Sequence, residues 1–239
     1  TFYTNSLEAL QQNYGLGHRL FEMDFNLTSD KKLAAVHDWH HFGNKDDVAP
    51  SSKEWKKFQG YGSPETPSRF TTMLIGDVFD QMIINRDMVL VTDTKSMEIP
   101  KEDRITQFKE LVSEANKRDK ELLDRVIPQI YNQEMFGEIE AIYPFQHIIY
   151  TLYSSPDSAE EVIDFISKHK EIEAVTISFA DPRFNQDFID AVHRLNKRIY
   201  IHTIHTYDDL TKYANVNVDG FYTGLLTPRD VALYESVSK

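Results

Sequence analysis

Two short segments of the sequence place charged side chains where a buried strand is expected. The segment LFEMDF carries Glu22 and Asp24, and the segment VLVTDTK carries Asp93 and Lys95. In a β-strand, residues i and i+2 project from the same face, so each charged pair converges on one side of its strand. Burying an ionised carboxylate costs several kcal/mol unless a cation or a hydrogen-bond donor compensates it. We therefore expect a cation against these carboxylates.

Three carboxylates offer only oxygen ligands, and this donor set determines which cation they favour. Oxygen ligands suit a hard divalent cation, Mg²⁺ or Ca²⁺, rather than zinc. The alternative is an ion pair that only stabilises the fold, formed among Glu22, Asp24, Arg19 and Lys95. The residue types alone leave both interpretations open.

His37 is a candidate for acid-base chemistry. It ends the apolar run LAAVHD, where strand alternation directs its ring toward the same end of the sheet as the carboxylates, and Asp38 follows it. A histidine oriented by a carboxylate can exchange protons near neutral pH. A histidine that only caps the strand end is the alternative.

Strand-like apolar runs alternate with amphipathic helical stretches from residue 86 onward. Strands are predicted near residues 20–25, 88–91, 125–131, 147–153, 174–179, 199–204 and 220–223. Helices are predicted near residues 102–117, 133–141, 158–168, 185–195, 208–214 and 228–237. This alternation favours an α/β fold of the TIM-type (β/α)8 barrel class, although one of its eight strands is missing from the predicted set.

The N-terminal third departs from simple alternation. Residues 6–13 read as the helix that would follow a first strand, so we expect a strand and a histidine-bearing loop before Thr1. Residues 33–37 follow the preceding strand too closely for a parallel crossover and are predicted to form a hairpin with it. Residues 40–68 are polar and longer than an ordinary connection, which predicts a rim or lid insertion within a single domain over residues 1–239.

Composition narrows the function classes. The chain has 239 residues, with 26 Lys and Arg against 38 Asp and Glu, and its net charge of -12 opposes binding to nucleic acid. It contains no cysteine and no apolar run of about 18 residues, so we expect neither thiolate chemistry nor a transmembrane segment. A soluble protein, cytoplasmic or extracytoplasmic, fits this composition. The oligomeric state is not indicated.

Several segments resemble, in order along the chain, the glycerophosphodiester phosphodiesterase family, which belongs to the phosphatidylinositol-specific phospholipase C-like barrels. The resemblance is carried by NSLEAL, FEMDFNLTSDKKLAAVHD, DTK, RVIPQIY, IYIHTI and VDGFYTGLLTP. It implies a metal-dependent hydrolase that cleaves glycerophosphodiesters or related phospholipid-derived phosphodiesters by acid-base catalysis. The substrate would be a small molecule, and a substrate held at a membrane surface is compatible with this class.

The resemblance also implies roles for individual residues. Glu22, Asp24 and Asp93 would hold a divalent cation, Mg²⁺ or Ca²⁺, and Lys95 would face the phosphate. His37 would be one of two catalytic histidines. His202 stands where the family usually has an aromatic residue and would shape the substrate pocket. Apart from the resemblance, Gln129 is a polar residue at a later strand end that is predicted to line the pocket, with ordinary barrel packing as the alternative.

Two features depart from the family pattern. Asp93 stands where a glutamate is commoner, and the His-Arg-Gly motif expected before NSLEAL does not occur in the sequence. The resemblance leaves open whether the nucleophile is water or a hydroxyl group of the substrate. A relative that binds a ligand or metal without turnover is one alternative function. A metal-dependent amidohydrolase barrel, suggested by HTIH at residues 202–205, is another.

Overall fold

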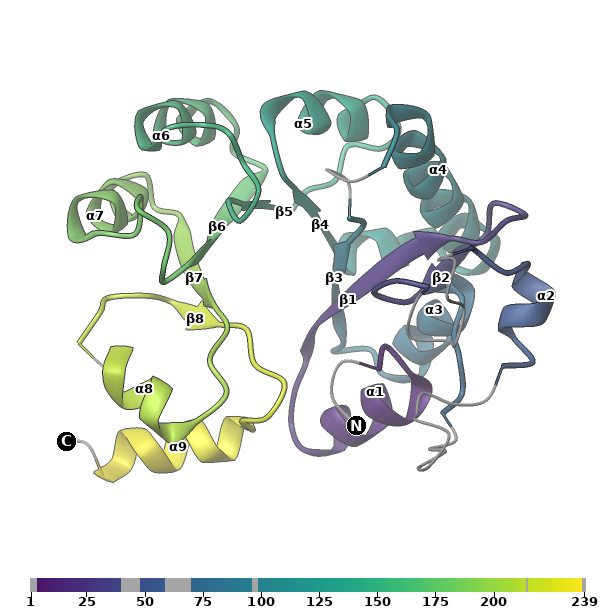
Figure 1. Cartoon of the computed structure of the whole chain (residues 1–239), viewed down its shortest axis with the longest axis horizontal. Coiled ribbons are helices and arrows are strands. Elements are labelled where there is room, and N and C mark those ends of the chain that lie inside the picture. The colour runs from purple at the N-terminus through teal and green to yellow at the C-terminus, as the bar shows by residue number, and fades with distance from the viewer. Residues whose placement is uncertain (1–3, 40–47, 59–69, 96–98, 214, 238–239) are drawn as a thin grey trace. The chain divides into compact units, whose positions relative to one another are not determined.

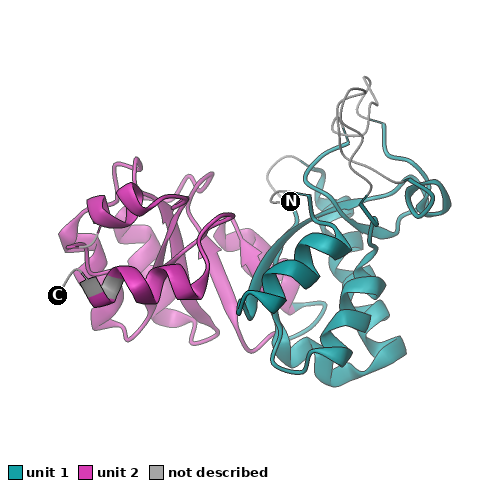
Figure 2. Ribbon diagram, turned by 90° about the horizontal axis from the view of Figure 1, so that it is seen from below, with its two compact units in different colours: residues 1–126, 141–144 teal, residues 127–140, 145–239 magenta. Residues whose placement is uncertain are grey.

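The computed structural model describes residues 4–39, 48–58, 70–95, 99–213 and 215–237. Much of the predicted rim or lid, including His40 and His41, lies outside these residues. Residue contacts divide the chain into two compact units, shown in Figure 2. Unit 1 contains residues 1–126 and 141–144, and unit 2 contains residues 127–140 and 145–239. The prediction of a single domain stays a prediction, and each unit is described by itself.

Unit 1 alternates helices and strands around a short sheet. Its elements are α1 (Leu7–Gly15), β1 (Leu20–Leu27), β2 (Leu33–Ala35), α2 (Ser52–Trp55), α3 (Ile75–Ile84), β3 (Val89–Asp93), α4 (Lys101–Arg118) and a 3-10 helix (Lys120–Arg125) (Figure 1). β1 pairs with β3 in parallel through residues 20–24 and with β2 in antiparallel fashion through residues 25–27. The predicted hairpin is therefore confirmed.

Unit 2 repeats a strand-helix pattern. Its elements are β4 (Val126–Ile130), which begins on the last residue of unit 1, α5 (Gln133–Glu140), β5 (Ile148–Thr151), α6 (Ala159–Lys168), β6 (Ile172–Ser178), α7 (Gln186–Arg194), β7 (Arg198–His202), α8 (Tyr207–Tyr213), β8 (Gly220–Phe221) and α9 (Pro228–Val237). Each strand from β4 to β8 pairs in parallel with the next. Parallel strands point their carboxyl ends toward one edge, where α/β proteins place their sites.

The local sequence explains where these helices begin. The hydroxyl of Ser6 accepts a hydrogen bond from the Ala9 N–H at the start of α1. At α6, Ser158 and Glu161 form the reciprocal capping box that the sequence predicts. Such caps satisfy backbone N–H groups that have no partner within the helix.

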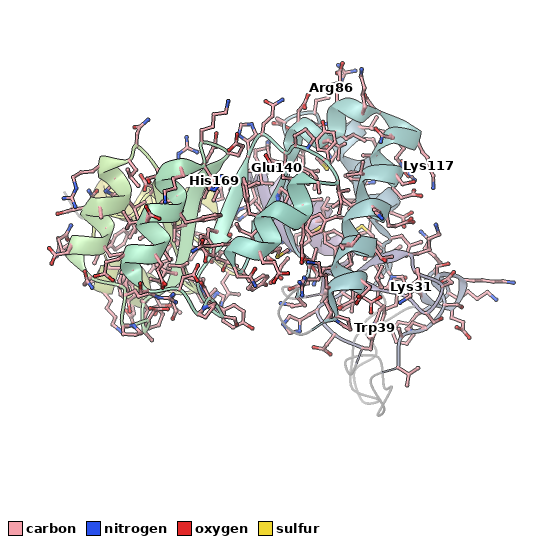
Figure 3. The ribbon with its side chains drawn as sticks, turned by 90° about the horizontal axis from the view of Figure 1, so that it is seen from above. Lys31, Trp39, Arg86, Lys117, Glu140 and His169 are labelled. Atoms are coloured by element: carbon pink, nitrogen blue, oxygen red, sulfur yellow. The ribbon has the colours of Figure 1, made fainter. Side chains whose placement is uncertain are left out.

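Unit 1 has an apolar core packed against β1 and β2. In unit 1, Phe25 from β1 and Phe79 from α3 are fully buried. Trp39, labelled in Figure 3, packs edge to face on Trp55 with ring centroids 5.4 Å apart. The Trp55 indole N–H donates to the Met73 carbonyl at 2.9 Å, which anchors the chain after β2. These contacts hold the hairpin and the strand ends in place.

Candidate active site

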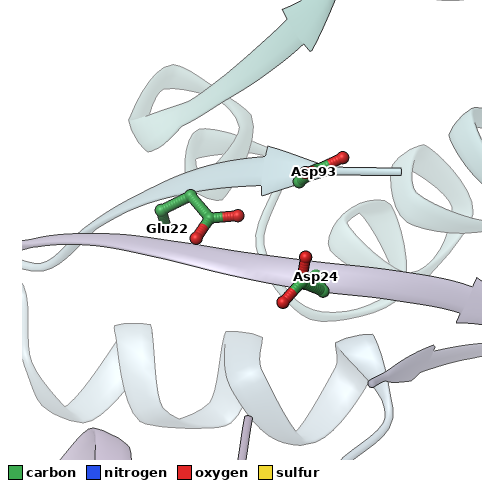
Figure 4. A group of neighbouring side chains, drawn as sticks. All are labelled: Glu22, Asp24 and Asp93. Carbon is green, nitrogen blue, oxygen red and sulfur yellow. The ribbon is translucent and has the colours of Figure 1, made fainter. Parts of the chain in front are cut away.

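The middle of β1 and the carboxyl end of β3 bring three carboxylates together, where the parallel pairing of the two strands ends (Figure 4). The parallel register sets Glu22 opposite Val91 and Asp24 opposite Asp93, so the predicted alternation places all three acidic side chains on one face. One ligand oxygen from each carboxylate lies within 4.8 Å of the others. On the opposite face, Met23 is buried in the core of unit 1. The acidic group is therefore a consequence of strand pairing.

Lys95 joins this group from the turn after β3. Its φ of 51° is left-handed, and its N–H donates to Asp93 Oδ1 at 3.0 Å. The ammonium lies 2.6 Å from Asp24 Oδ1 and 3.0 Å from Asp93 Oδ2, with 14% of the side chain exposed. Partial burial acts to lower the pKa of Lys95, but the charges of Asp93 and Asp24 outweigh it and raise the pKa above its ordinary value. Lys95 is thus a fixed positive charge beside the carboxylates.

Among the three carboxylates, Glu22 is the one whose ionised form is disfavoured by its surroundings. Protein atoms crowded around its carboxyl group, followed by the charges of Asp24 and Asp93, raise its pKa well above the ordinary value. Residue 22 is nevertheless exposed to solvent, so we assign the rise chiefly to repulsion from the two aspartates. Converging carboxylates of this kind favour a cation among them.

The alternative interpretation, an ion pair that stabilises the fold, included Arg19 as a partner of the carboxylates, and this assignment of Arg19 is wrong. The Arg19 guanidinium lies 2.6 Å from Asp87 and stacks 4.1 Å over the ring of Tyr14. It therefore pairs at the start of β1, and the cation paired with Asp24 and Asp93 is Lys95.

The hairpin brings His37 next to the acidic strand. The Val36 N–H donates to the Asp24 carbonyl at 2.9 Å, so β2 ends beside the carboxylate-bearing part of β1. The Asn26 amide donates to the carbonyls of Val36 and His37 at 3.2 and 2.9 Å. His37 Nδ1 lies 2.7 Å from Asp38 Oδ2, and 57% of the His37 side chain is exposed. Asp38 thus contacts the ring as the sequence suggests.

Gln129 and His202 both lie in unit 2, at the carboxyl ends of β4 and β7. The Tyr222 hydroxyl donates to the side-chain oxygen of Gln129 at 3.0 Å, and the Tyr222 ring lies 6.3 Å from that of His202, edge to face. Tyr153 contacts His202 in the same way at 6.3 Å. Burial lowers the pKa of His202 despite the nearby charge of Asp181. Its Nε2 is buried and has no hydrogen-bond partner among the described residues.

Two asparagines support site residues that the sequence did not connect to them. Asn26 continues the acidic face of β1 and holds the backbone of His37. Asn5 precedes α1 and forms two hydrogen bonds with Asp24. The i+2 spacing of Glu22, Asp24 and Asn26 indicates that Asn26 shares a strand face with the two carboxylates. No local pattern indicates the contact of Asn5 with Asp24.

Fold and site together define an α/β protein with an acidic, lysine-containing site at the end of a parallel strand pairing. The profile of the glycerophosphoryl diester phosphodiesterase family matches residues 1–224, and the chain belongs to this family. The predicted enzyme class, a phosphoric diester hydrolase, is confirmed by this membership. No curated protein matches the chain.

Solved structures with low sequence identity share the fold. A protein from Silicibacter pomeroyi assigned as a glycerophosphoryl diester phosphodiesterase is 15% identical, with a TM-score of 0.79 over 100% of this chain and 90% of its own. A glycerophosphodiester phosphodiesterase from Parabacteroides distasonis is 16% identical, with a TM-score of 0.73 over 99% and 92%. A phosphodiesterase from Oleispira antarctica is 14% identical, with a TM-score of 0.74 over 98% and 92%. These similarities confirm the predicted α/β class of TIM-barrel type.

Proposed function

We propose that the protein is a divalent-cation-dependent glycerophosphodiester phosphodiesterase that releases sn-glycerol-3-phosphate and an alcohol. The observation that carries this proposal is the group of Glu22, Asp24 and Asp93 with Lys95, where the parallel pairing of two strands ends in a chain from this family. The Oleispira antarctica relative is described in complex with the product sn-glycerol-3-phosphate, which supports the choice of substrate class.

The three carboxylates fit a divalent cation by number and donor type. Their ligand atoms lie within 4.8 Å of one another, and all are oxygens, as Mg²⁺ and Ca²⁺ prefer. A cation bound there would neutralise phosphodiester oxygens and lower the pKa of the attacking hydroxyl or water.

Described residues contain no helix of the length and apolarity that a membrane crossing demands.

Lys95 and His37 supply the remaining chemistry in this proposal. The Lys95 ammonium stabilises negative charge that develops on the phosphorus-bound oxygens. Because Asp38 lies at Nδ1 of His37, it favours the ring tautomer with its proton on Nδ1 and its lone pair on Nε2. That tautomer suits His37 to accept a proton from the nucleophile as the new P–O bond forms and the bond to the leaving alcohol breaks.

Within unit 2, we assign Gln129 and His202 to substrate binding rather than to proton transfer. His202 has a lowered pKa and is flanked by two tyrosine rings, so at neutral pH it is an uncharged hydrogen-bonding group. A polar substrate group would satisfy its buried Nε2, and a buried polar atom without a partner is costly. Tyr222 links this histidine to Gln129.

Calorimetry with MgCl2 and with CaCl2 tests the cation site. Asp24→Asn should weaken binding by more than about tenfold because one charged ligand is lost. Asp87→Asn is the matched control, since Asp87 is an exposed aspartate paired with Arg19 at the start of β1. Equal affinity in wild type and Asp24→Asn would rule out this cation site. Loss of affinity in both variants would point to a general charge effect.

A further inference from the structure

Asn5 and Asp24 are 19 residues apart in sequence and are joined by two hydrogen bonds. The Asn5 amide nitrogen donates to Asp24 Oδ2 at 3.0 Å, and the Asn5 side-chain oxygen accepts from the Asp24 N–H at 3.1 Å. We infer that Asn5 is a positioning residue that orients the Asp24 carboxylate for the divalent cation. This inference rests on the proposed cation site, and it assigns to Asn5 no contact with substrate.

The two hydrogen bonds require an amide side chain. A carboxamide carries a donor and an acceptor on one rigid plane, so a single residue can hold both the backbone and the carboxylate of Asp24. In a parallel ladder only alternate residues of a strand bond to a given neighbour. Arg19 belongs to the set that bonds to β3, because its carbonyl accepts from the Val89 N–H at 2.8 Å. Asp24 belongs to the other set, so its N–H points away from β3. Asn5 thus accepts a hydrogen bond from the Asp24 N–H, which does not bond to β3, and at the same time holds the Asp24 carboxylate.

The backbone at Asn5 suits this residue type as well. Its φ of 47° lies in the left-handed region, which asparagine tolerates better than most residues with a Cβ atom. The left-handed residue stands directly before the N-cap Ser6. Asparagine therefore meets both the backbone and the side-chain requirements of this position.

The segment that carries Asn5 is itself held firmly. The Thr4 and Ser6 hydroxyls are buried and lie 2.8 Å apart. The Leu7 N–H donates to the Thr71 carbonyl at 3.1 Å. Glu8 accepts from the Thr71 N–H at 2.8 Å and from its hydroxyl at 2.7 Å. Asn5 is therefore a fixed support for Asp24.

Asn5 and Lys95 divide the two oxygens of Asp24 between them. Asn5 contacts Oδ2, and Lys95 lies 2.6 Å from Oδ1. With one partner on each oxygen, the plane of the carboxylate is fixed, so less side-chain freedom is lost when a cation binds. Groups that hold metal ligands in this way typically contribute about 10- to 100-fold to metal affinity.

The test is the affinity for MgCl2 and CaCl2, measured by calorimetry on Asn5→Gly. Glycine adopts the left-handed conformation without strain, so this substitution removes the two hydrogen bonds and leaves the backbone free to keep its path. Asn196→Gly is the matched control, because Asn196 is an exposed asparagine with a φ of 57° between α7 and β7. Thermal unfolding in the presence of a chelator shows whether each variant is folded.

We expect Asn5→Gly to bind both cations about 10- to 100-fold more weakly, and Asn196→Gly to bind them as wild type does. Excess cation should restore turnover of Asn5→Gly to near the wild-type kcat, which a simple loss of structure would not allow. If wild type binds the cations and Asn5→Gly binds them equally tightly, the role inferred for Asn5 is overturned and the proposed cation site is not. Absence of binding by wild type would instead overturn the proposed cation site.

A second variant covers the case in which Asn5→Gly does not fold. Asn5→Ala also removes both hydrogen bonds and gives the unfolded chain less freedom than glycine does, although its Cβ is strained at the left-handed φ of 47°. If it folds, the same loss of cation affinity is expected. Unfolding of both variants in chelator would overturn the inference, because Asn5 would then act on the stability of the fold.

Discussion

The Lys95 ammonium lies 2.6 Å from Oδ1 of Asp24, across the pairing of β1 with β3. It also contacts Asp93, so one cationic side chain links the middle of β1 to the end of β3. Its exposed fraction of 14% means that the three charges are only partly screened by water. This arrangement holds a positive charge beside the acidic group.

Lys95→Met should lower kcat by about 10²- to 10³-fold, the usual loss when one group that stabilises transition-state charge is removed. Lys31→Met is a matched control, because Lys31 also has a left-handed φ, of 61°, and also pairs with an aspartate, Asp103. Steady-state turnover of glycerophosphocholine measures both variants. An unchanged kcat in Lys95→Met would show that Lys95 only offsets charge in the fold.

His37→Ala should lower turnover by about 10²- to 10⁴-fold, the range for one acid-base group. Because more than half of the His37 side chain is exposed, the free energy of unfolding should change by less than about 0.5 kcal/mol. His147→Ala is the control, since His147 is another histidine paired with a carboxylate, 2.8 Å from Glu173. Full activity of a folded His37→Ala variant would contradict the catalytic role, and a strongly destabilised variant would assign His37 to the fold.

Asp30 should make the stability of unit 1 depend on acid pH. It accepts hydrogen bonds from the Ser52 N–H, the Ser52 hydroxyl and the Thr28 hydroxyl, and the Ser52 hydroxyl and then the Thr28 hydroxyl lower its pKa to about 2. A carboxyl group with a lowered folded-state pKa stabilises the fold above its unfolded pKa, and this contribution is lost as pH falls toward 2. Asp30→Asn should therefore be less stable than wild type at pH 6.

The expected difference is about 1 kcal/mol after allowance for solvent screening of an exposed group, and it should shrink between about pH 4 and pH 2. Urea unfolding at a series of pH values measures it. Asp164→Asn is a control, because Asp164 is an exposed aspartate paired with Lys168 within helix α6. A difference that stays constant down to pH 2 would contradict the assigned pKa of Asp30.

Local patterns in the sequence explain how far the site could be predicted. The i+2 spacing of Glu22 and Asp24 specifies a face of β1, and strand pairing then brings Asp93 to the same face. The short connection to Leu33 allows only a hairpin, which the antiparallel pairing confirms. These features depend on residues close in sequence or on the regular geometry of parallel strands.

Contacts between distant residues could not be predicted in this way. Asn5 hydrogen-bonds Asp24 across 19 residues, and the helix that follows Asn5 is tied to Thr71 by a hydrogen bond that spans 63 residues. Helix α3 was also missed, because its N-cap is Leu74, which has no capping side chain. Asp77 instead accepts the Leu74 N–H at 2.8 Å. Such features depend on tertiary packing, which overrides local propensity.

The most direct test of the proposed activity is the release of sn-glycerol-3-phosphate from glycerophosphocholine, glycerophosphoethanolamine and glycerophosphoglycerol. Each substrate would be assayed with MgCl2, with CaCl2 and with a chelator, beside the Asp24→Asn variant. We predict turnover of at least one substrate with a divalent cation, loss of that turnover in chelator, recovery when the cation is returned, and little activity in Asp24→Asn. Turnover that persists in chelator would contradict the role of the cation, and no turnover with either cation would contradict the proposed activity itself.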